Sequence, residues 1–285
     1  MIMEVRTLEH ITDDVLADTF AAAFADYPTQ FSHSQIFSIL KRRGYRGDFS
    51  VGMFDNGRLV SFVLNGVRSH NGLLTAYDTG TGTIKEYRGK GLTKRLLNEA
   101  VATVKSKGVE QYLLEVLCEN APAVALYEKN GFRTDRIFLC HSQSTSKIKL
   151  PDSKTNHIEI EAVDVSSVTD TYGQFCDFAP SWQNSVKSIL AAHDELIGFR
   201  AKVGANTVGL VVGDPHHGDI AVLAVAPGMR RIGIGTELLK SFVAHNQSDI
   251  FKILNIDEHC QSLPEFLKRC NIPESVRQYE MSKLL

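Results

Sequence analysis

Alternating and helically spaced apolar residues predict an ordered series of elements in the first half of the chain. Period-two alternation and short apolar runs predict strands at residues 3–8, 49–54, 59–66, 72–83, 111–117 and 132–140. Apolar residues at helical spacing predict helices at residues 12–25, 34–43, 92–107 and 121–130. An Asn-Gly pair at 56–57 predicts a tight hairpin turn. The resulting order is strand, two helices, three strands, helix, strand, helix and strand.

The second half of the chain repeats this order. Strands are predicted at residues 158–163, 195–203, 206–213, 219–225, 251–256 and 275–281, and helices before 193, up to 245 and at 263–270. Residues 141–156, between the halves, are mostly polar and fit a linker. We therefore expect two related domains, 1–145 and 157–285, joined by residues 146–156. Antiparallel hairpins followed by a β-α-β crossover predict an α/β sandwich in each domain.

Two glycine-rich segments stand at corresponding places in the two halves, each after a strand and before a helix. Residues 88–93 read Arg-Gly-Lys-Gly-Leu-Thr, and residues 230–235 read Arg-Arg-Ile-Gly-Ile-Gly. The N-terminus of a helix presents unpaired backbone N–H groups and the positive end of the helix dipole, and glycine lets an anion approach closely. Each segment is therefore a candidate phosphate cradle, and the pair suggests two domains that each hold a phosphorylated cofactor.

Composition narrows the possible classes of protein. The chain has 285 residues, enough for two domains with cores, and its formal charge of −2 lacks the basic excess of a nucleic-acid binder. The apolar runs are far shorter than a membrane span of ~20 residues, and the first residues do not resemble a signal peptide. The five cysteines are scattered, without a Cys-x-x-Cys pair. These features predict a cytoplasmic protein with reduced thiols, no metal site, and no nucleic-acid or membrane partner.

Further motifs follow the first glycine-rich segment. Residues 120–123 read Asn-Ala-Pro-Ala, and residues 126–132 read Leu-Tyr-Glu-Lys-Asn-Gly-Phe. With the element order, these motifs resemble the GNAT superfamily of N-acetyltransferases in its tandem two-domain form, whose pyrophosphate loop reads Gln/Arg-x-x-Gly-x-Gly/Ala. The first loop departs from that pattern only at Thr93, and the second matches it fully. The second half has Leu267 where the first has Tyr127, so its later signature is degenerate.

The resemblance implies two α/β domains, each with a mixed, mostly antiparallel sheet flanked by helices, and acetyl-CoA as cofactor. The pantetheine arm is expected to pair with the strand end before the first loop. For Lys90, contact with the phosphates of the cofactor and simple exposure to solvent are equally open. In the first half the expected cofactor contacts are Thr83, Ile84, Arg88, Gly89, Lys90, Gly91, Leu92, Thr93 and Asn120. In the second half they are Val225, Arg230, Arg231, Gly233, Ile234, Gly235 and Thr236.

Three residues are candidates for the chemistry that the resemblance implies, direct attack of an amine on the thioester. Tyr127 occupies the family position of the acid that protonates the departing CoA thiolate; the alternative is a core aromatic. An acceptor ammonium must also lose a proton. Asp78, before the first loop, and Glu115, on the following strand, are both candidate bases. The sequence leaves that choice open, because Asp78 can equally bind backbone groups and Glu115 can be solvated or paired with a lysine.

The acceptor site is expected near the loop between the first two helices. Asp26, Tyr27 and Phe31 place a carboxylate beside aromatic rings, which suits a cationic amine, although the two rings can equally close the core. We therefore expect acetylation of a primary amine, on a small molecule or a protein, by the first domain of a monomer or homodimer. The alternatives are catalysis by the second domain and a non-catalytic protein that binds or senses acyl-CoA.

Overall fold

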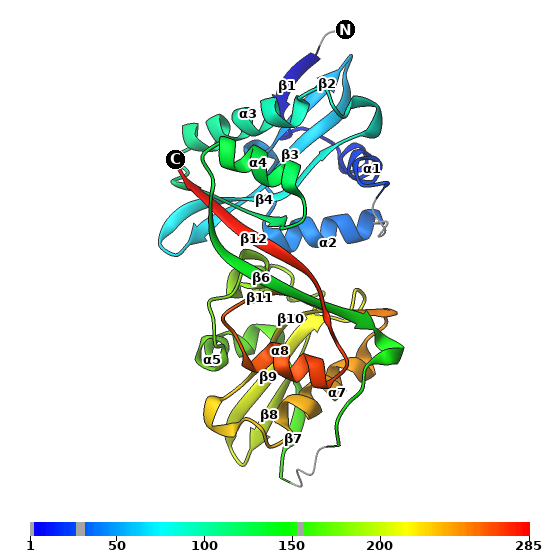
Figure 1. Ribbon diagram of the computed structural model, residues 1–285, viewed down its shortest axis with the longest axis vertical. Helices are drawn as coiled ribbons and strands as arrows, with labels where there is room; N and C mark the ends of the chain where they lie inside the picture. The colour runs from blue at the N-terminus through cyan, green and yellow to red at the C-terminus, as the bar shows by residue number, and fades with distance from the viewer. Residues whose placement is uncertain (1–2, 27–31, 153–156) are drawn as a thin grey trace. The chain divides into compact units, whose positions relative to one another are not determined.

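The chain forms two units, each with a mixed, mostly antiparallel sheet flanked by helices, which confirms the predicted fold class (Figure 1). The computed structural model describes residues 3–26, 32–152 and 157–285. Unit 1 consists of Met1–Val116, Asn120–Asp135 and Glu280–Leu285, and unit 2 of Leu117–Glu119 and Arg136–Tyr279. Among the described residues, no helix has both the length and the apolar composition needed to cross a membrane.

The sheet of unit 1 runs in the order β1-β2-β3-β4-β5, with the end of β12 beyond β5. Neighbouring strands from β1 to β4 are antiparallel, whereas β4 and β5 are parallel. The strands are β1 (Met3–Thr7), β2 (Val51–Asp55), β3 (Arg58–His70), β4 (Leu73–Thr83) and β5 (Gln111–Leu117). The helices are α1 (Asp13–Ala23), α2 (His33–Arg43), α3 (Leu92–Ser106) and α4 (Ala121–Lys129).

The sheet of unit 2 runs in the order β12-β6-β11-β10-β9-β8-β7, where β12 contributes its first residues. Its strands are β6 (Arg133–Ser144), β7 (Glu159–Val163), β8 (Ile197–Val203), β9 (Asn206–Asp214), β10 (Asp219–Val225) and β11 (Ile250–Asp257). Its helices are α5 (Thr169–Phe175), α6 (Val186–Ala191), α7 (Ile234–His245) and α8 (Ser262–Arg269), and β12 (Glu274–Leu284) follows α8. The parallel pair β10–β11 corresponds to β4–β5 of unit 1.

The units differ from the expected domain division because strands are exchanged between the halves of the sequence. β6 follows α4 of unit 1, but its residues 138–144 pair with β11 of unit 2. β12 follows α8 of unit 2, but Glu280–Leu285 belongs to unit 1, where the Leu285 N–H donates to the Glu110 carbonyl at 2.9 Å. Residues 141–144, the start of the polar stretch, therefore lie in a strand, and the first polypeptide half alone does not complete unit 1.

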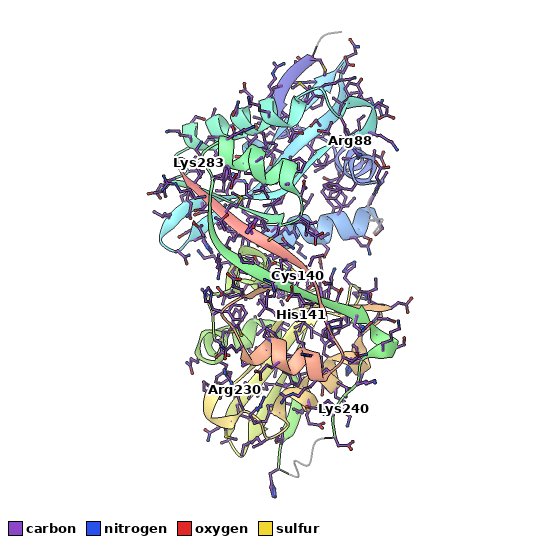
Figure 2. All side chains as sticks on the ribbon, viewed as in Figure 1. Arg88, Cys140, His141, Arg230, Lys240 and Lys283 are labelled. Atoms are coloured by element: carbon purple, nitrogen blue, oxygen red, sulfur yellow. The ribbon has the colours of Figure 1, made fainter. Side chains whose placement is uncertain are left out.

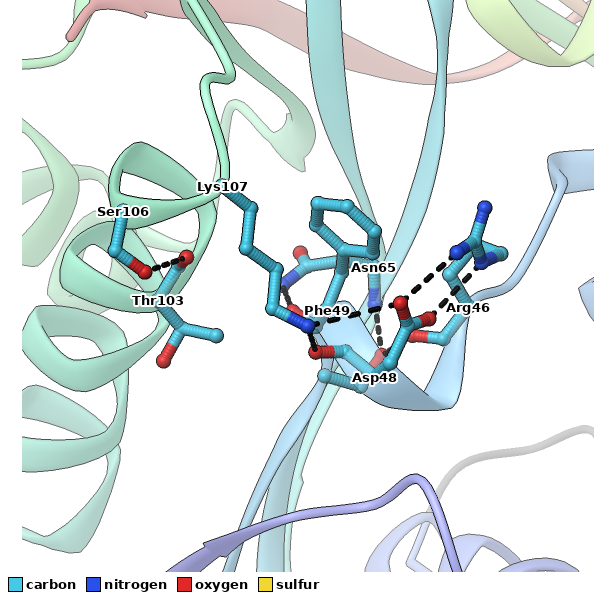
Figure 3. Close-up of polar contacts among 8 residues, drawn as sticks. Arg46, Asp48, Phe49, Asn65, Thr103, Ser106 and Lys107 are labelled. Carbon is cyan, nitrogen blue, oxygen red and sulfur yellow. Dashed lines mark hydrogen bonds and ion pairs between the residues drawn. The ribbon is translucent and has the colours of Figure 1, made fainter.

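Polar contacts hold α3 at its C-terminal end. The Lys107 Nζ donates to the backbone oxygen of Asp48 at 2.6 Å (Figure 3). The Asp48 carboxylate in turn accepts hydrogen bonds from Arg46 at 2.9 and 2.8 Å. One face of α3 is apolar, with Leu96 and Val104 fully buried. Because the first glycine-rich loop precedes α3, these contacts fix where the N-terminus of the helix points.

The parallel strands of each unit separate soon after they begin to pair. In unit 1 the β4–β5 pairing ends at Tyr77 and Leu113, and in unit 2 the β10–β11 pairing ends at Ile220 and Ile253. Beyond these points the backbone groups of the diverging strands need other partners. A separation of this kind provides room for an extended ligand whose amides continue the sheet.

The last residues of β12 supply a test of the strand exchange. Met281 is fully buried and Leu284 is 73% exposed. Met281→Ala should lower the free energy of unfolding by about 2–5 kcal/mol, because it leaves a cavity in the core. Leu284→Ala, the matched control, should change it by less than about 0.5 kcal/mol. Urea unfolding followed by circular dichroism makes the comparison, and equal effects would contradict this placement of β12.

Candidate active site

The first glycine-rich loop, residues 88–93 (loop 1), exposes the N-terminus of α3. Gly89 and Gly91 have φ values of 75° and 73°, and Gly91 caps the helix. Among the described residues other than its two chain neighbours, none has a heavy atom within 4 Å of the position that a Cβ would take at either glycine. L-residues with side chains rarely adopt this conformation, so glycine permits the turn. The first N–H groups of α3 lack helical acceptors, so the loop is an open anion cradle.

Arg88 fastens loop 1 to the rest of unit 1 (Figure 2). Its Nε donates to the Thr83 carbonyl at 3.1 Å and its Nη2 to the Ala23 carbonyl at 2.9 Å. Its Nη1 donates to Asp26 Oδ2 at 2.6 Å. The hydrogen bond from Arg88, and then that from Lys85, lowers the pKa of Asp26. Asp26, a candidate residue of the acceptor site, therefore helps to hold loop 1 in place through Arg88.

Arg230 makes the same set of contacts in unit 2, where residues 230–235 form loop 2 (Figure 2). Its Nε donates to the Val225 carbonyl at 2.9 Å and its Nη2 to the Phe175 carbonyl at 3.2 Å. Its guanidinium also binds both carboxylate oxygens of Asp177, at 2.9 and 2.8 Å. Burial alone would raise the pKa of Asp177, but hydrogen bonds from Arg230 and Ser262 bring it below its usual value.

These matching contacts align the two units residue by residue. They pair Thr83 with Val225 at the strand end before the loop, and Ala23 with Phe175 at the end of the first α-helix of each unit. Asp177 escaped the sequence analysis, because only the fold shows that it lies beside Arg230. The sequence feature that could have identified Asp177 is its position shortly after a helix, because Asp26 has the same kind of position in the first half.

The two loops differ at their last residue. In loop 1 the Thr93 Oγ1 lies 3.2 Å from the Thr83 Oγ1, which lies 2.6 Å from the Ser61 Oγ. In loop 2 a Cβ on Gly235 would approach Phe266 to 3.6 Å and Val225 to 3.9 Å. A hydroxyl-bearing side chain therefore occupies, in unit 1, a position that has no side chain in unit 2 and that lies in van der Waals range of Phe266.

Unit 2 contains a cavity of about 350 Å³ at loop 2. Its walls come from the separating strands β10 and β11, the ends of α5 and α7, and α8. The seven residues expected to contact the cofactor in this half all line it: Val225, Arg230, Arg231, Gly233, Ile234, Gly235 and Thr236. The size is within the range of small-molecule sites. Arg231 stands at the loop position that Gly89 occupies in loop 1, and its φ of 67° is likewise positive.

In unit 1 the structure joins Asp78 to Tyr127. An irregularity in the β3–β4 pairing leaves Thr79 opposite no partner, a β-bulge of the kind that redirects side chains. The Asp78 carboxylate accepts hydrogen bonds from the Thr81 hydroxyl at 2.6 Å, from the Gly80 N–H at 2.9 Å and from Tyr127. Burial raises the pKa of Asp78 to about 6, although all three hydrogen bonds oppose the shift.

The other side of Tyr127 is packed in the core. Its side chain is buried and meets the Phe132 ring edge-on at 5.7 Å between centroids. Asn120 caps α4, the helix that carries Tyr127, by accepting from the Ala123 N–H at 3.3 Å. Tyr127 can therefore be both a core aromatic and the candidate acid, because the packed ring fixes where its hydroxyl points.

Glu115 has a different partner. It accepts a hydrogen bond from Tyr77, which is fully buried. Burial, followed by the charge of Glu115, raises the pKa of Tyr77 well above its usual value. Arg43, which the sequence analysis did not identify, donates to the Thr79 carbonyl at 2.9 Å, and its charge lowers the pKa of Asp78. Of the two candidate bases, Asp78 is therefore the one bonded to the candidate acid.

Apart from Asn120, which caps α4, the first-half contacts expected for the cofactor lie along the end of β4 and the start of α3. Thr83 ends β4, and Leu92 begins α3. Ile84 is buried, and its N–H donates to the Val60 carbonyl at 3.0 Å. The ammonium of Lys90 lies 4.5 Å from the centre of the Tyr87 ring.

Two expected acceptor residues, Tyr27 and Phe31, fall outside the residues that the structure describes. Within the described part of the chain, no group of three or more His, Cys, Asp and Glu side chains is arranged to hold a metal ion.

Unit 2 has aliphatic residues at the positions of all three candidate catalytic residues. In unit 1 the bulge residue Thr79 directly follows Asp78, and in unit 2 the bulge residue Ala221 directly follows Ile220. Ile220 therefore corresponds to Asp78. The β10–β11 register places Leu254 at the position of Glu115. Leu267 takes the place of Tyr127 and, like Ile220, is fully buried. Unit 2 therefore keeps the cradle but has no titratable pair at these aligned positions.

The family assignment agrees with this geometry. The model of the acetyltransferase (GNAT) family matches residues 14–132 and 151–255, which together make up more than half of the chain. The chain therefore belongs to this family, with one match in each half, and is by class an N-acetyltransferase.

Curated relatives are similar to part of this chain. It is 29% identical over 104 residues to N-alpha-acetyltransferase 30 of Schizosaccharomyces pombe, covering 36% of this chain and 69% of that protein. It is 30% identical over 86 residues to N-alpha-acetyltransferase MAK3 of Arabidopsis thaliana, covering 30% of this chain and 45% of that protein. The match therefore spans less than half the length of the second relative.

A solved structure shares the fold along nearly the whole chain. A tandem GNAT protein from the clavulanic acid biosynthesis pathway superimposes with a TM-score of 0.75, covering 99% of this chain and 98% of that one. Sequence identity is 12%, so this similarity shows the tandem fold alone.

Proposed function

We propose that this protein transfers the acetyl group of acetyl-CoA to a primary amine of a small molecule or a protein, and that unit 1 performs the transfer. The observation that carries the proposal is the Asp78–Tyr127 hydrogen bond, which unit 2 replaces with Ile220 and Leu267. Both units keep a cradle for an anion, but only unit 1 has a titratable pair at these positions.

The residues of unit 1 fit acetyl-CoA as the acyl donor. Loop 1 offers the N–H groups at the start of α3 to the pyrophosphate, and Arg88 holds the loop in place. The separation of β4 from β5 beyond Tyr77 suits the amide-bearing pantetheine arm. Acetyl-CoA, when bound, supplies an acyl group already activated as a thioester.

The Asp78–Tyr127 pair provides a route for the proton that the reaction must move. With a pKa of about 6, Asp78 is mostly a carboxylate at neutral pH, and it accepts a proton from the acceptor ammonium directly or through water. Tyr127 gives its proton to the departing thiolate and regains one from Asp78, to which it is hydrogen-bonded. The acceptor ammonium loses two protons as it becomes an amide: one reaches sulfur by this route, and the second passes to water. Activity should rise with pH as Asp78 loses its proton.

The names of the curated relatives guide the choice of acceptor. Both are N-alpha-acetyltransferases, each about 30% identical to part of this chain. Peptides with a free N-terminal α-amine are therefore the first acceptors to test, followed by small alkylamines.

The role of Tyr127 is tested by removing its hydroxyl. Tyr127→Phe should lower kcat by roughly 10²–10⁴-fold in steady-state assays with acetyl-CoA and an amine, because the leaving thiolate loses its acid. Tyr112→Phe is the matched control, since the buried Tyr112 hydroxyl donates to Asn65 Oδ1 instead. Leu267→Tyr should add no turnover. A Tyr127→Phe enzyme with the wild-type rate would show that another group protonates the thiolate.

The cavity at loop 2 supports a second role, in which unit 2 holds acyl-CoA without turnover. Gly91→Glu and Gly233→Glu each place a carboxylate at the N-terminus of the helix, where it repels the pyrophosphate. Calorimetry should find two acetyl-CoA sites in the wild type and one in each variant. Turnover should disappear only in Gly91→Glu. Its disappearance only in Gly233→Glu would place the chemistry in unit 2.

A further inference from the structure

The C-terminal end of α2 packs directly on the sheet of unit 1. Gly44 ends the helix in the left-handed conformation, with a φ of 75°. The helix end comes so close to β3 that a Cβ on Gly66 would lie 2.1 Å from the Arg43 carbonyl oxygen. Beside it, Tyr45 forms an antiparallel bridge with Gly66. The backbone of Arg43, the last residue of α2, is therefore held against β3.

From this position the Arg43 side chain reaches the bulge of β4. Thr79 is left out of the β3–β4 pairing, so its carbonyl needs a partner from outside the ladder. The Arg43 Nη1 donates to that carbonyl at 2.9 Å. The Thr79 hydroxyl donates to the Leu64 carbonyl at 3.1 Å. The buried bulge residue is thus fastened to α2 by its backbone and to β3 by its side chain.

The bulge determines where the Asp78 carboxylate points. Asp78 directly precedes Thr79, and its carboxylate turns back onto the residues that follow the bulge. It accepts hydrogen bonds from the Gly80 N–H at 2.9 Å and from the Thr81 hydroxyl at 2.6 Å, besides that from Tyr127. Because Thr79 lies between Asp78 and these two donors, a change in its backbone would move the carboxylate relative to Tyr127.

Charged and titratable side chains reach Asp78 and its neighbour Tyr77 from four elements. They are Arg43 from α2, Tyr77 itself from β4, Tyr112 and Glu115 from β5, and Tyr127 from α4. Arg43 is the cation of this set, and its positive charge lowers the pKa of Asp78 against the effect of burial. The side chain that holds the bulge therefore also favours the carboxylate form of Asp78.

We propose that Arg43 is a positioning residue for the acetyl transfer, because its hydrogen bond to Thr79 holds the bulge that directs Asp78 toward Tyr127. This inference rests on the proposed function of unit 1 and adds a role for α2. That helix follows the segment where the acceptor is expected, so one side chain joins that side of unit 1 to the base.

The proposal is tested by the pH dependence of kcat and KM for full-length variants with acetyl-CoA and an amine. Arg43→Gln should lower kcat at about pH 8 by roughly tenfold or more with little change in KM, because the base is displaced. Its acid limb should move to higher pH, because Asp78 loses a nearby positive charge. Arg43→Lys keeps the charge, so its limb should stay closer to that of the wild type while kcat still falls.

Arg68→Gln is the matched control. The Arg68 Nη2 donates to the Arg42 carbonyl at 2.9 Å, so this residue holds the same helix end from β3. Its loss should leave the acid limb where it is in the wild type. An unmoved limb in Arg43→Gln, or an equal movement in Arg68→Gln, would overturn the role of Arg43. The proposed function would still stand if the wild type acetylates the amine.

Two further measurements keep the test decisive. If no amine is acetylated, the proposed function fails, and carbon-13 NMR titration of the aspartate carboxyls tests Arg43 directly, with Asp78→Asn identifying the Asp78 signal. The pKa of Asp78 should then be higher in Arg43→Gln than in the wild type, and an unchanged pKa would overturn the inference. If circular dichroism shows that Arg43→Gln does not fold, Arg43→Lys decides, because a wild-type kcat there would show that the guanidinium does not position the base.

Discussion

In each unit one arginine ties the glycine-rich loop to the preceding strand and to the end of the first α-helix. Arg88 and Arg230 make this contact with the same atoms and corresponding partners. Each hydrogen bond from a charged donor contributes about 1.5–3 kcal/mol where it is buried, and less where water competes. The contact fixes the helix N-terminus at the end of β4 or β10, past the point where the parallel strands separate. The phosphate cradle and the space for a thioester depend on that placement.

Backbone and side chains have diverged to different extents. Both units keep the turn, the bulge and the separated strands, which are the features that a CoA molecule would meet along its length. The residues around the expected reacting end differ in kind. Unit 1 has Asp78 and Tyr127, whereas unit 2 has Ile220 and Leu267. This difference is the basis for the proposal that chemistry belongs to unit 1 and that unit 2 has a binding role.

The sequence predicted those features that depend on local patterns. Period and turn residues located the elements and the duplication, and the helix N-terminal glycines located both loops. Strand exchange was not predictable, because the pattern of β12 shows that it is a strand but not which strand it pairs with. The choice between Asp78 and Glu115 depended on a bulge and on α4, which lie far apart in the sequence. The sequence suggested Asp26 as a ligand for an amine. Its contact with Arg88 was not predictable, because the two residues lie 62 positions apart in the chain.

The central claim is that Asp78 is the base of a single active centre in unit 1. The most direct test is the pH dependence of kcat/KM with an amine acceptor, measured for the wild type, Asp78→Asn and Glu115→Gln. The wild type should lose activity as the pH falls through about 6, where Asp78 takes up a proton. This limb should persist in Glu115→Gln and be absent from the residual activity of Asp78→Asn. A limb that persists in Asp78→Asn and vanishes in Glu115→Gln would contradict the assignment.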